Sequence, residues 1–293
     1  MLFRSYREML FTTAGAEQFI SGVILFDETI RQSTASGTPF VEVLAKKGIV
    51  PGIKVDLGGK DLPFSGGEKV TEGLDGLRER LAEYRKIGAR FAKWRGILSI
   101  GPGRPSDRCV HANAHALARY AALCVEQGLT PIVEPEVLMD GSHDLEACLA
   151  ATTKTLKATF AELVGAGVPP AQMLLKPNMV LSGADCPKMA TDEEIAKATI
   201  RCFRATVPEA VPGIVFLSGG QTEAQATSRL NAMHALGEKL PWRLSFSYGR
   251  ALQATALKTW KGVAKNVAAA QKAFLARATL NGAAVRGRYA ASM

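Results

Sequence analysis

Short apolar runs alternate along the chain with longer segments in which apolar residues recur at helical spacing. Each run has the length of a β-strand and is entered from a glycine, a proline or a polar turn, as strands commonly are. The pattern predicts seven strands, at residues 21–26, 51–56, 91–95, 130–136, 173–177, 213–220 and 243–249.

The segments between these runs are predicted to be helices. Apolar residues repeat at helical spacing in each of them. Gly128 stands where the second helix is expected to end, and Thr191 with Glu194 three residues later forms the pattern of a capping box. The predicted helices span residues 74–87, 112–127, 144–164, from 191, 221–236, and a last pair from about 251 to the C-terminus.

Strands that alternate with helices at intervals of about 30–40 residues form βαβ units and a parallel sheet. An open doubly wound sheet is the alternative, but it usually carries a Gly-x-Gly-x-x-Gly loop after its first strand, and no such motif opens a helix here. We therefore predict an α/β fold, a (β/α)8 TIM barrel with only seven of the eight strand–helix units. No linker divides the chain, so residues 1–293 are expected to form one barrel domain that is incomplete at its N-terminus.

The chain carries a formal net charge of +9, and its basic residues are dispersed. No run of five Lys or Arg occurs and no interleaving of aromatic with basic residues suggests base stacking, so we expect no nucleic-acid partner. No stretch of 18 apolar residues occurs and the N-terminus has no apolar signal region, so we expect no membrane partner and a cytoplasmic location.

The cysteines and histidines give no pattern of a metal site. Five cysteines occur, and no pair has the spacing of metal ligands, so we expect reduced thiols. His111 and His115 are four residues apart, but no third ligand is near them in the sequence. We predict neither a metal nor a cofactor.

Charged side chains gather at the ends of the predicted strands. Residues i and i+2 of a strand point to the same face, so three strands each direct two charges to one side. These pairs are Lys54 with Asp56, Lys93 with Arg95, and Glu134 with Glu136. Lys176 closes a fourth strand. One such charge is usually solvated, but burying several requires pairing. Because barrel active sites lie at this rim, we predict one polar site.

The composition of this rim suggests its chemistry. An unprotonated lysine can condense with a ketone to form an iminium ion, which then accepts electrons. Lys176 follows two leucines, and burial together with the cations Lys93 and Arg95 would lower its pKa. Glu134 and Glu136 are candidate acids and bases. The residue pattern alone also allows Lys176 to be an ordinary solvated strand end.

Two further strand ends carry residues suited to binding phosphate. Glycines let the backbone approach an anion, backbone N–H groups donate to it, and a guanidinium binds it in two places. The candidates are Ser218, Gly219, Gly220, Ser247, Gly249 and Arg250. An ordinary strand–helix turn is the alternative for the Ser-Gly-Gly sequence.

Six of these segments, in order along almost the whole chain, resemble the class I fructose-bisphosphate aldolase family. The matching segments are Gly52-Ile-Lys-Val-Asp, Phe91-Ala-Lys-Trp-Arg, Ile132-Val-Glu-Pro-Glu, Leu174-Leu-Lys-Pro-Asn-Met, Phe216-Leu-Ser-Gly-Gly-Gln and Phe246-Ser-Tyr-Gly-Arg-Ala-Leu-Gln. The resemblance implies a metal-independent lyase of glycolysis and gluconeogenesis. Such an enzyme reversibly cleaves fructose 1,6-bisphosphate into dihydroxyacetone phosphate and glyceraldehyde 3-phosphate. The resemblance also implies a homotetramer.

The resemblance assigns a role to each matched residue. Lys176 corresponds to the lysine that forms the Schiff base, Glu134 to the main acid and base, and Glu136 to a carboxylate beside the lysine. Lys93 and Arg95 correspond to residues near the reacting carbons and a substrate phosphate. Lys54 also matches a site lysine, and the ketone-side phosphate site is matched by Ser218, Gly219, Ser247, Gly249 and Arg250.

The chain departs from the family pattern at both ends. The family's first strand ends in Ala-Ala-Asp-Glu-Ser, and no segment here matches it; the tail ending in tyrosine that some members carry is also unmatched. These departures leave open a catalytically impaired barrel that acts as a binding or scaffold protein. A third alternative is another lysine-dependent aldolase, such as one for deoxyribose phosphate, and sedoheptulose 1,7-bisphosphate remains open as a substrate.

Overall fold

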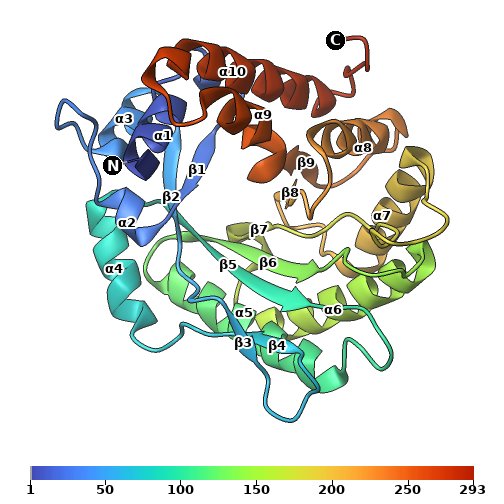
Figure 1. Ribbon diagram of the computed structural model, residues 1–293. Helices are drawn as coiled ribbons and strands as arrows, with labels where there is room; N and C mark the ends of the chain where they lie inside the picture. The colour runs from blue at the N-terminus through green and yellow to red at the C-terminus, as the bar shows by residue number, and fades with distance from the viewer. Residues whose placement is uncertain (1) are drawn as a thin grey trace.

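Seven parallel strands form one curled sheet in this computed structural model, which describes residues 2–293 and the side chains from residue 4 onward (Figure 1). The order across the sheet is β1-β2-β5-β6-β7-β8-β9, so each strand lies beside its neighbour in the sequence. The strands are β1 (Gly22–Leu25), β2 (Val50–Lys54), β5 (Phe91–Leu98), β6 (Thr130–Val137), β7 (Leu174–Leu175), β8 (Gly213–Phe216) and β9 (Arg243–Phe246). The predicted seven-stranded α/β architecture is confirmed.

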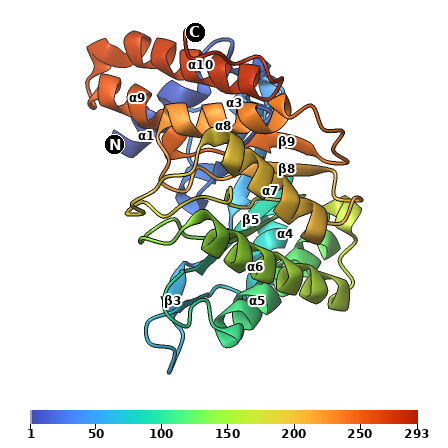
Figure 2. The ribbon, with the colours of Figure 1, turned by 90° about the vertical axis from the view of Figure 1, so that its right-hand side faces the viewer.

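Helices cover the outer face of this sheet (Figure 2). They are α1 (Leu2–Phe11), α2 (Asp27–Ile30), α3 (Phe40–Lys46), α4 (Leu77–Ile87), α5 (Asp107–Glu126), α6 (Leu145–Gly165), α7 (Asp192–Thr206), α8 (Glu223–Ala235), α9 (Arg250–Trp260) and α10 (Val267–Ala284). Short 3-10 turns, η1 (Ala16–Gln18), η2 (Pro170–Gln172) and η3 (Ala264–Asn266), lie in the connections. The predicted capping box at Thr191 opens α7, with both of its hydrogen bonds formed.

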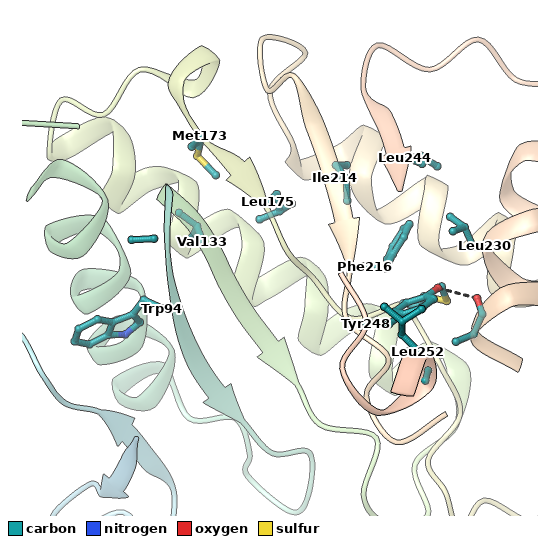
Figure 3. Packing of buried hydrophobic residues seen from close by; sticks show 14 of the residues in the cluster. Trp94, Val133, Met173, Leu175, Ile214, Phe216, Leu230, Leu244, Tyr248 and Leu252 are labelled. Atoms are coloured by element: carbon teal, nitrogen blue, oxygen red, sulfur yellow. Dashed lines mark hydrogen bonds between the residues drawn. The ribbon is translucent and has the colours of Figure 1, made fainter. Parts of the chain in front are cut away.

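The register of the strands brings their charged residues to one level. Lys54 of β2 pairs with Lys93 of β5, and Arg95 of β5 pairs with Glu134 of β6. The backbone N–H of Lys176 donates to the carbonyl of Val133 at 2.8 Å, which fixes the end of β7 against β6. Side chains that alternate with these charges point outward into the hydrophobic core. Trp94, fully buried, stacks on Tyr120 of α5, as predicted for the opposite strand face (Figure 3).

Several elements were not predicted from the sequence. A short antiparallel hairpin, β3 (Gly59–Asp61) with β4 (Lys69–Thr71), follows β2. Helices α1, α2 and α3 also went unpredicted. Two of these elements are strands of three residues and α2 has only four, so they are too short to show a hydrophobic period.

In the described part of the chain the two edge strands of the sheet, β1 and β9, do not pair with each other, and helix α10 packs against α1 on one side and against α8 and α9 on the other. Figure 1 shows α10 crossing from α1 to α8 above these edges. At one end the Gln271 side chain donates to the carbonyl of Met9 at 2.9 Å. At the other end, Thr227 of α8 donates to the side-chain oxygen of Asn281 at 2.7 Å. Helix α10 therefore bridges elements from both ends of the chain.

No helix within residues 2–293 combines the length and the apolar character needed to cross a membrane.

Candidate active site

The carboxylate of Glu134 lies between two lysines at the C-terminal ends of the strands. Lys176 Nζ is 3.0 Å from Glu134 Oε1, and Lys93 Nζ is 2.9 Å from Glu134 Oε2. All three residues are buried, with exposed fractions of 8%, 7% and 3% for Lys176, Lys93 and Glu134. The structure thus brings together three residues that the sequence predicted from three different strands.

A second carboxylate, Asp56, holds the other side of this cluster. It lies 2.6 Å from Lys54 Nζ and 3.5 Å from Lys93 Nζ, and it accepts a hydrogen bond from the backbone N–H of Arg95 at 3.3 Å. Its side chain is only 3% exposed. The sequence placed Asp56 on the same face as Lys54 but gave it no role in the site. Lys93 is therefore shared between Asp56 and Glu134.

Arg95 and Glu136 form the outer part of the same rim. The Arg95 guanidinium donates to the Glu136 carboxylate, which is buried. Partial burial lowers the pKa of Arg95, but the hydrogen bond to Glu136 and attraction to Glu136, Glu134 and Asp56 together outweigh it, so the pKa is raised and the residue stays charged. Glu136 is thus neutralised by Arg95, whereas Glu134 faces the two lysines.

Burial controls the protonation of Lys176 and Glu134 in opposite ways. Burial lowers the pKa of Lys176, and attraction to Glu134, which raises it, only partly offsets this effect; the nearby charge of Lys93 lowers it further. Burial by itself would raise the pKa of Glu134, but attraction to Lys176 and Lys93 reverses this, so the pKa is lowered. A buried amine with a lowered pKa is more readily unprotonated, which is the form that attacks a carbonyl.

A cavity of about 370 Å³ opens beside this cluster. Lys54, Lys93 and Lys176 line one part of it, and Ser247 and Gly249 line another. Such a volume lies within the range of sites for small molecules. The lysines and the predicted phosphate-binding loop after β9 therefore face one space.

The remaining predicted phosphate residues lie in the loops after β8 and β9. Gly219 and Gly220 adopt φ angles of +52° and +86°, a left-handed conformation that suits glycine. Ser218 is buried, whereas Arg250 is exposed at the first residue of α9. The loops are joined where the backbone N–H of Ser247 donates to the carbonyl of Phe216 at 2.8 Å. Among the side chains of residues 4–293, Arg250 forms no ion pair.

The histidines that the sequence considered for a metal lie on the outer surface. His111 and His115 of α5 approach the two oxygens of Glu162 on α6 at 3.2 Å and 3.0 Å. No group of three His, Cys, Asp or Glu side chains in the described part of the chain has the arrangement of a metal site. Cys109, Cys124, Cys148 and Cys202 are buried, and all five cysteines are free thiols.

Comparison with known proteins gives the same family along the whole chain. Residues 3–293 match the family model described as "Fructose-bisphosphate aldolase class-I". The chain belongs to the class I fructose-bisphosphate aldolase family. The family resemblance predicted from six motifs is confirmed, and so is the metal-independent glycolytic lyase that it implied.

Individual aldolases are similar over nearly the full length of this chain. A probable class 1 fructose-bisphosphate aldolase of Xanthomonas axonopodis pv. citri is 56% identical over 287 residues, which cover 98% of this chain and 86% of the relative. A cytosolic fructose-bisphosphate aldolase of Arabidopsis thaliana, number 4, is 54% identical over 98% of this chain and 73% of its own length. The crystallised aldolase of Plasmodium falciparum, solved with TRAP and an inhibitor, superposes with a TM-score of 0.97 at 49% identity, covering 99% of this chain and 84% of that one. These comparisons give no support to a non-catalytic scaffold.

Proposed function

We propose that this chain reversibly cleaves fructose 1,6-bisphosphate through a Schiff base on Lys176. The observation that carries this proposal is the placement of the Lys176 amine. It is buried, its pKa is lowered, and it lies 3.0 Å from a carboxylate at the edge of a cavity. A surface lysine would be neither buried nor held at a lowered pKa.

The proposed reaction begins when the Lys176 amine attacks the ketone carbon of the sugar. Glu134, which has taken the proton that the Lys176 ammonium gives up to become an amine, passes this proton to the carbinolamine hydroxyl, which leaves as water and gives an iminium ion. Glu134 next takes the proton of the C4 hydroxyl, and the C3–C4 bond breaks. Its electron pair moves into the iminium to give an enamine while glyceraldehyde 3-phosphate departs as the aldehyde. Protonation of C3 and addition of water then release dihydroxyacetone phosphate and restore the amine.

The other predicted residues bind and orient the substrate in this proposal. Lys93, shared by Asp56 and Glu134, keeps the acid–base carboxylate in position and stabilises negative charge on the reacting oxygens. Arg95, held by Glu136, and Lys54 receive the phosphate on the aldehyde side. The ketone-side phosphate is bound by Ser218, Gly219, Gly220, Ser247, Gly249 and Arg250.

Trapping with borohydride tests the proposal. Dihydroxyacetone phosphate and borohydride together are expected to leave a reduced adduct on the peptide that contains Lys176, located by mass spectrometry. The Lys176→Met variant should carry no adduct, and a Lys157→Met variant, changed at an exposed lysine, should be labelled like the unchanged protein. An adduct on Lys93, or none at all, would contradict the mechanism.

We further propose that residues 1–293 act as one barrel domain in a cytoplasmic homotetramer. Support comes from relatives named as cytosolic aldolases and from the family resemblance. Light scattering should give a mass about four times that of the 31.2 kDa chain. Rates measured with sedoheptulose 1,7-bisphosphate and fructose 1,6-bisphosphate at equal concentration should favour the fructose sugar.

A further inference from the structure

A buried arginine, Arg229, lies behind the loop that follows β8. It belongs to α8 and is 5% exposed. Its NH1 group donates to Gln221 Oε1 at 2.9 Å, and its Nε lies 3.2 Å from Asp192 Oδ1 at the start of α7. The Asp192 side chain is 42% exposed, so this carboxylate is partly solvated and neutralises the buried guanidinium incompletely.

Gln221 connects this arginine to the Ser-Gly-Gly loop. Its backbone N–H and its side-chain Nε2 both donate to the carbonyl of Ser218, each at 2.9 Å. That carbonyl is therefore held toward Gln221. The left-handed conformations of Gly219 and Gly220 complete the turn between them. Arg229 acts on the side chain of Gln221, so it restrains the loop without lying in it.

The second loop is tied to the same helix. The hydroxyl of Tyr248 donates to the carbonyl of Ala226 at 2.8 Å, the bond drawn at Tyr248 in Figure 3. Ala226 lies one turn before Arg229 on α8, and Tyr248 is followed by Gly249 and Arg250. Both loops proposed to hold the ketone-side phosphate are thus fixed to one segment of α8.

Keeping a guanidinium in this place is unfavourable for stability alone. Burial of a cation costs free energy that only close, complete pairing repays, and apolar replacements of buried ion pairs are often neutral or stabilising. The charge of Arg229 is linked through Gln221 to the loop that is proposed to bind a phosphate dianion, and a nearby cation makes the potential there more favourable for an anion. This arrangement suits a binding site better than a structural ion pair.

We propose that Arg229 is a positioning residue for the ketone-side phosphate, acting through Gln221 on the loop at residues 218–220. The inference rests on the proposed function, because it assigns that loop to the phosphate of dihydroxyacetone phosphate. It predicts that removing Arg229 weakens the binding of one substrate, dihydroxyacetone phosphate, and not that of the other. Dihydroxyacetone phosphate carries only this phosphate, whereas glyceraldehyde 3-phosphate carries only the other.

The test compares Arg229→Met, Gln221→Met and the double variant in the condensation reaction. Hydrogen bonds to charged groups are worth enough that the concentration of dihydroxyacetone phosphate giving half-maximal rate should rise about tenfold or more in each single variant. The concentration of glyceraldehyde 3-phosphate that gives half-maximal rate should change by less than about threefold, and so should kcat. Both residues act along one path, so their effects should not multiply. The double variant should need about the same concentration of dihydroxyacetone phosphate for half-maximal rate as the more severely affected single variant.

The matched control is Arg204→Met, which removes an exposed arginine of α7 that pairs with Glu238. It should leave both half-maximal concentrations unchanged. Multiplying effects in the double variant, or equal losses for both substrates, would overturn the positioning role. If Arg229→Met does not fold, as judged by its thermal melt, Gln221→Met decides: an unchanged value for dihydroxyacetone phosphate refutes the inference.

Borohydride trapping separates this inference from the proposed function. At saturating dihydroxyacetone phosphate, Gln221→Met should still form the Lys176 adduct. An adduct that forms with unaltered concentration dependence contradicts only the role of Arg229. Absence of the adduct from the unchanged protein contradicts the Schiff-base proposal itself.

Discussion

Replacing Lys93 with methionine should raise the pKa of Lys176. The two amines contact opposite oxygens of Glu134, at 2.9 Å and 3.0 Å. They therefore lie within about 8 Å of each other, where two like charges repel by about 2 kcal/mol at an effective dielectric constant of about 20. That energy corresponds to about 1.5 pKa units. The side chain of Lys93 is 8% exposed and that of Lys176 is 11% exposed, so solvent screens the repulsion little.

Competitive labelling with an amine-reactive reagent measures this change directly. Only the unprotonated amine reacts, so the extent of labelling of the Lys176 peptide against pH gives its pKa without requiring turnover. The midpoint should move upward by about 1 to 1.5 units in Lys93→Met, because Lys93 lowers the pKa of Lys176 in the unchanged protein. Lys157, which is exposed, serves as an internal reference in every sample.

The matched control is Lys46→Met, because Lys46 lies on α3 in an exposed pair with Glu42. It should leave the Lys176 midpoint unchanged. An upward shift leaves fewer unprotonated Lys176 amines at neutral pH, so formation of the Schiff base should slow. A midpoint that stays constant or falls in Lys93→Met would refute repulsion between the two amines as a cause of the lowered pKa.

Three further changes test other parts of the molecule. Glu134→Gln leaves two buried ammonium groups without their shared carboxylate and should lower the free energy of unfolding in urea by about 3–5 kcal/mol at neutral pH. Because the pKa of Glu134 is lowered in the fold, this deficit should be complete above the unfolded pKa of about 4.3 and should shrink as the pH falls below it toward the lowered pKa of the folded protein. Trp94→Ala, at a fully buried residue stacked on Tyr120, should cost about 3–5 kcal/mol in thermal unfolding, and Trp94→Phe less. A chelator should leave the cleavage rate unchanged; a loss of activity would indicate that a metal ion, rather than the iminium formed on Lys176, accepts the electron pair.

The sequence predicted the strands and the grouping of their charges because both follow from local rules. A run such as that containing Lys93 and Arg95 is short, apolar and bounded by turns, and the alternation of a strand puts these two cations on one face. The same rule placed Glu134 with Glu136. Parallel strands then bring such faces to a common rim, so the existence of one polar site could be predicted before any contact was known.

The partners within that site depend on register between strands and on packing between helices. The sequence could not tell that Glu134, rather than Glu136, contacts Lys176, because this depends on how β6 and β7 align. Arg229 carries no local signal either, since its partners Gln221 and Asp192 are 8 and 37 residues away. The sequence does show that Asp56 shares a strand face with Lys54, because the two are two residues apart. Only the structure shows that Asp56 contacts both Lys54 and Lys93.

The bridge made by α10 has a consequence for the order in which the chain folds during synthesis. The hydrogen bond between Gln271 and Met9 joins residues 262 apart, so α1 leaves the ribosome long before its partner exists. Contacts of such large separation form late, since the entropy of closing the loop must be offset first. Every residue of the lysine cluster is translated before α10. A nascent chain therefore contains every residue of the lysine cluster while the edges of its sheet are still unbridged, and unpaired strand edges make such a chain prone to aggregation.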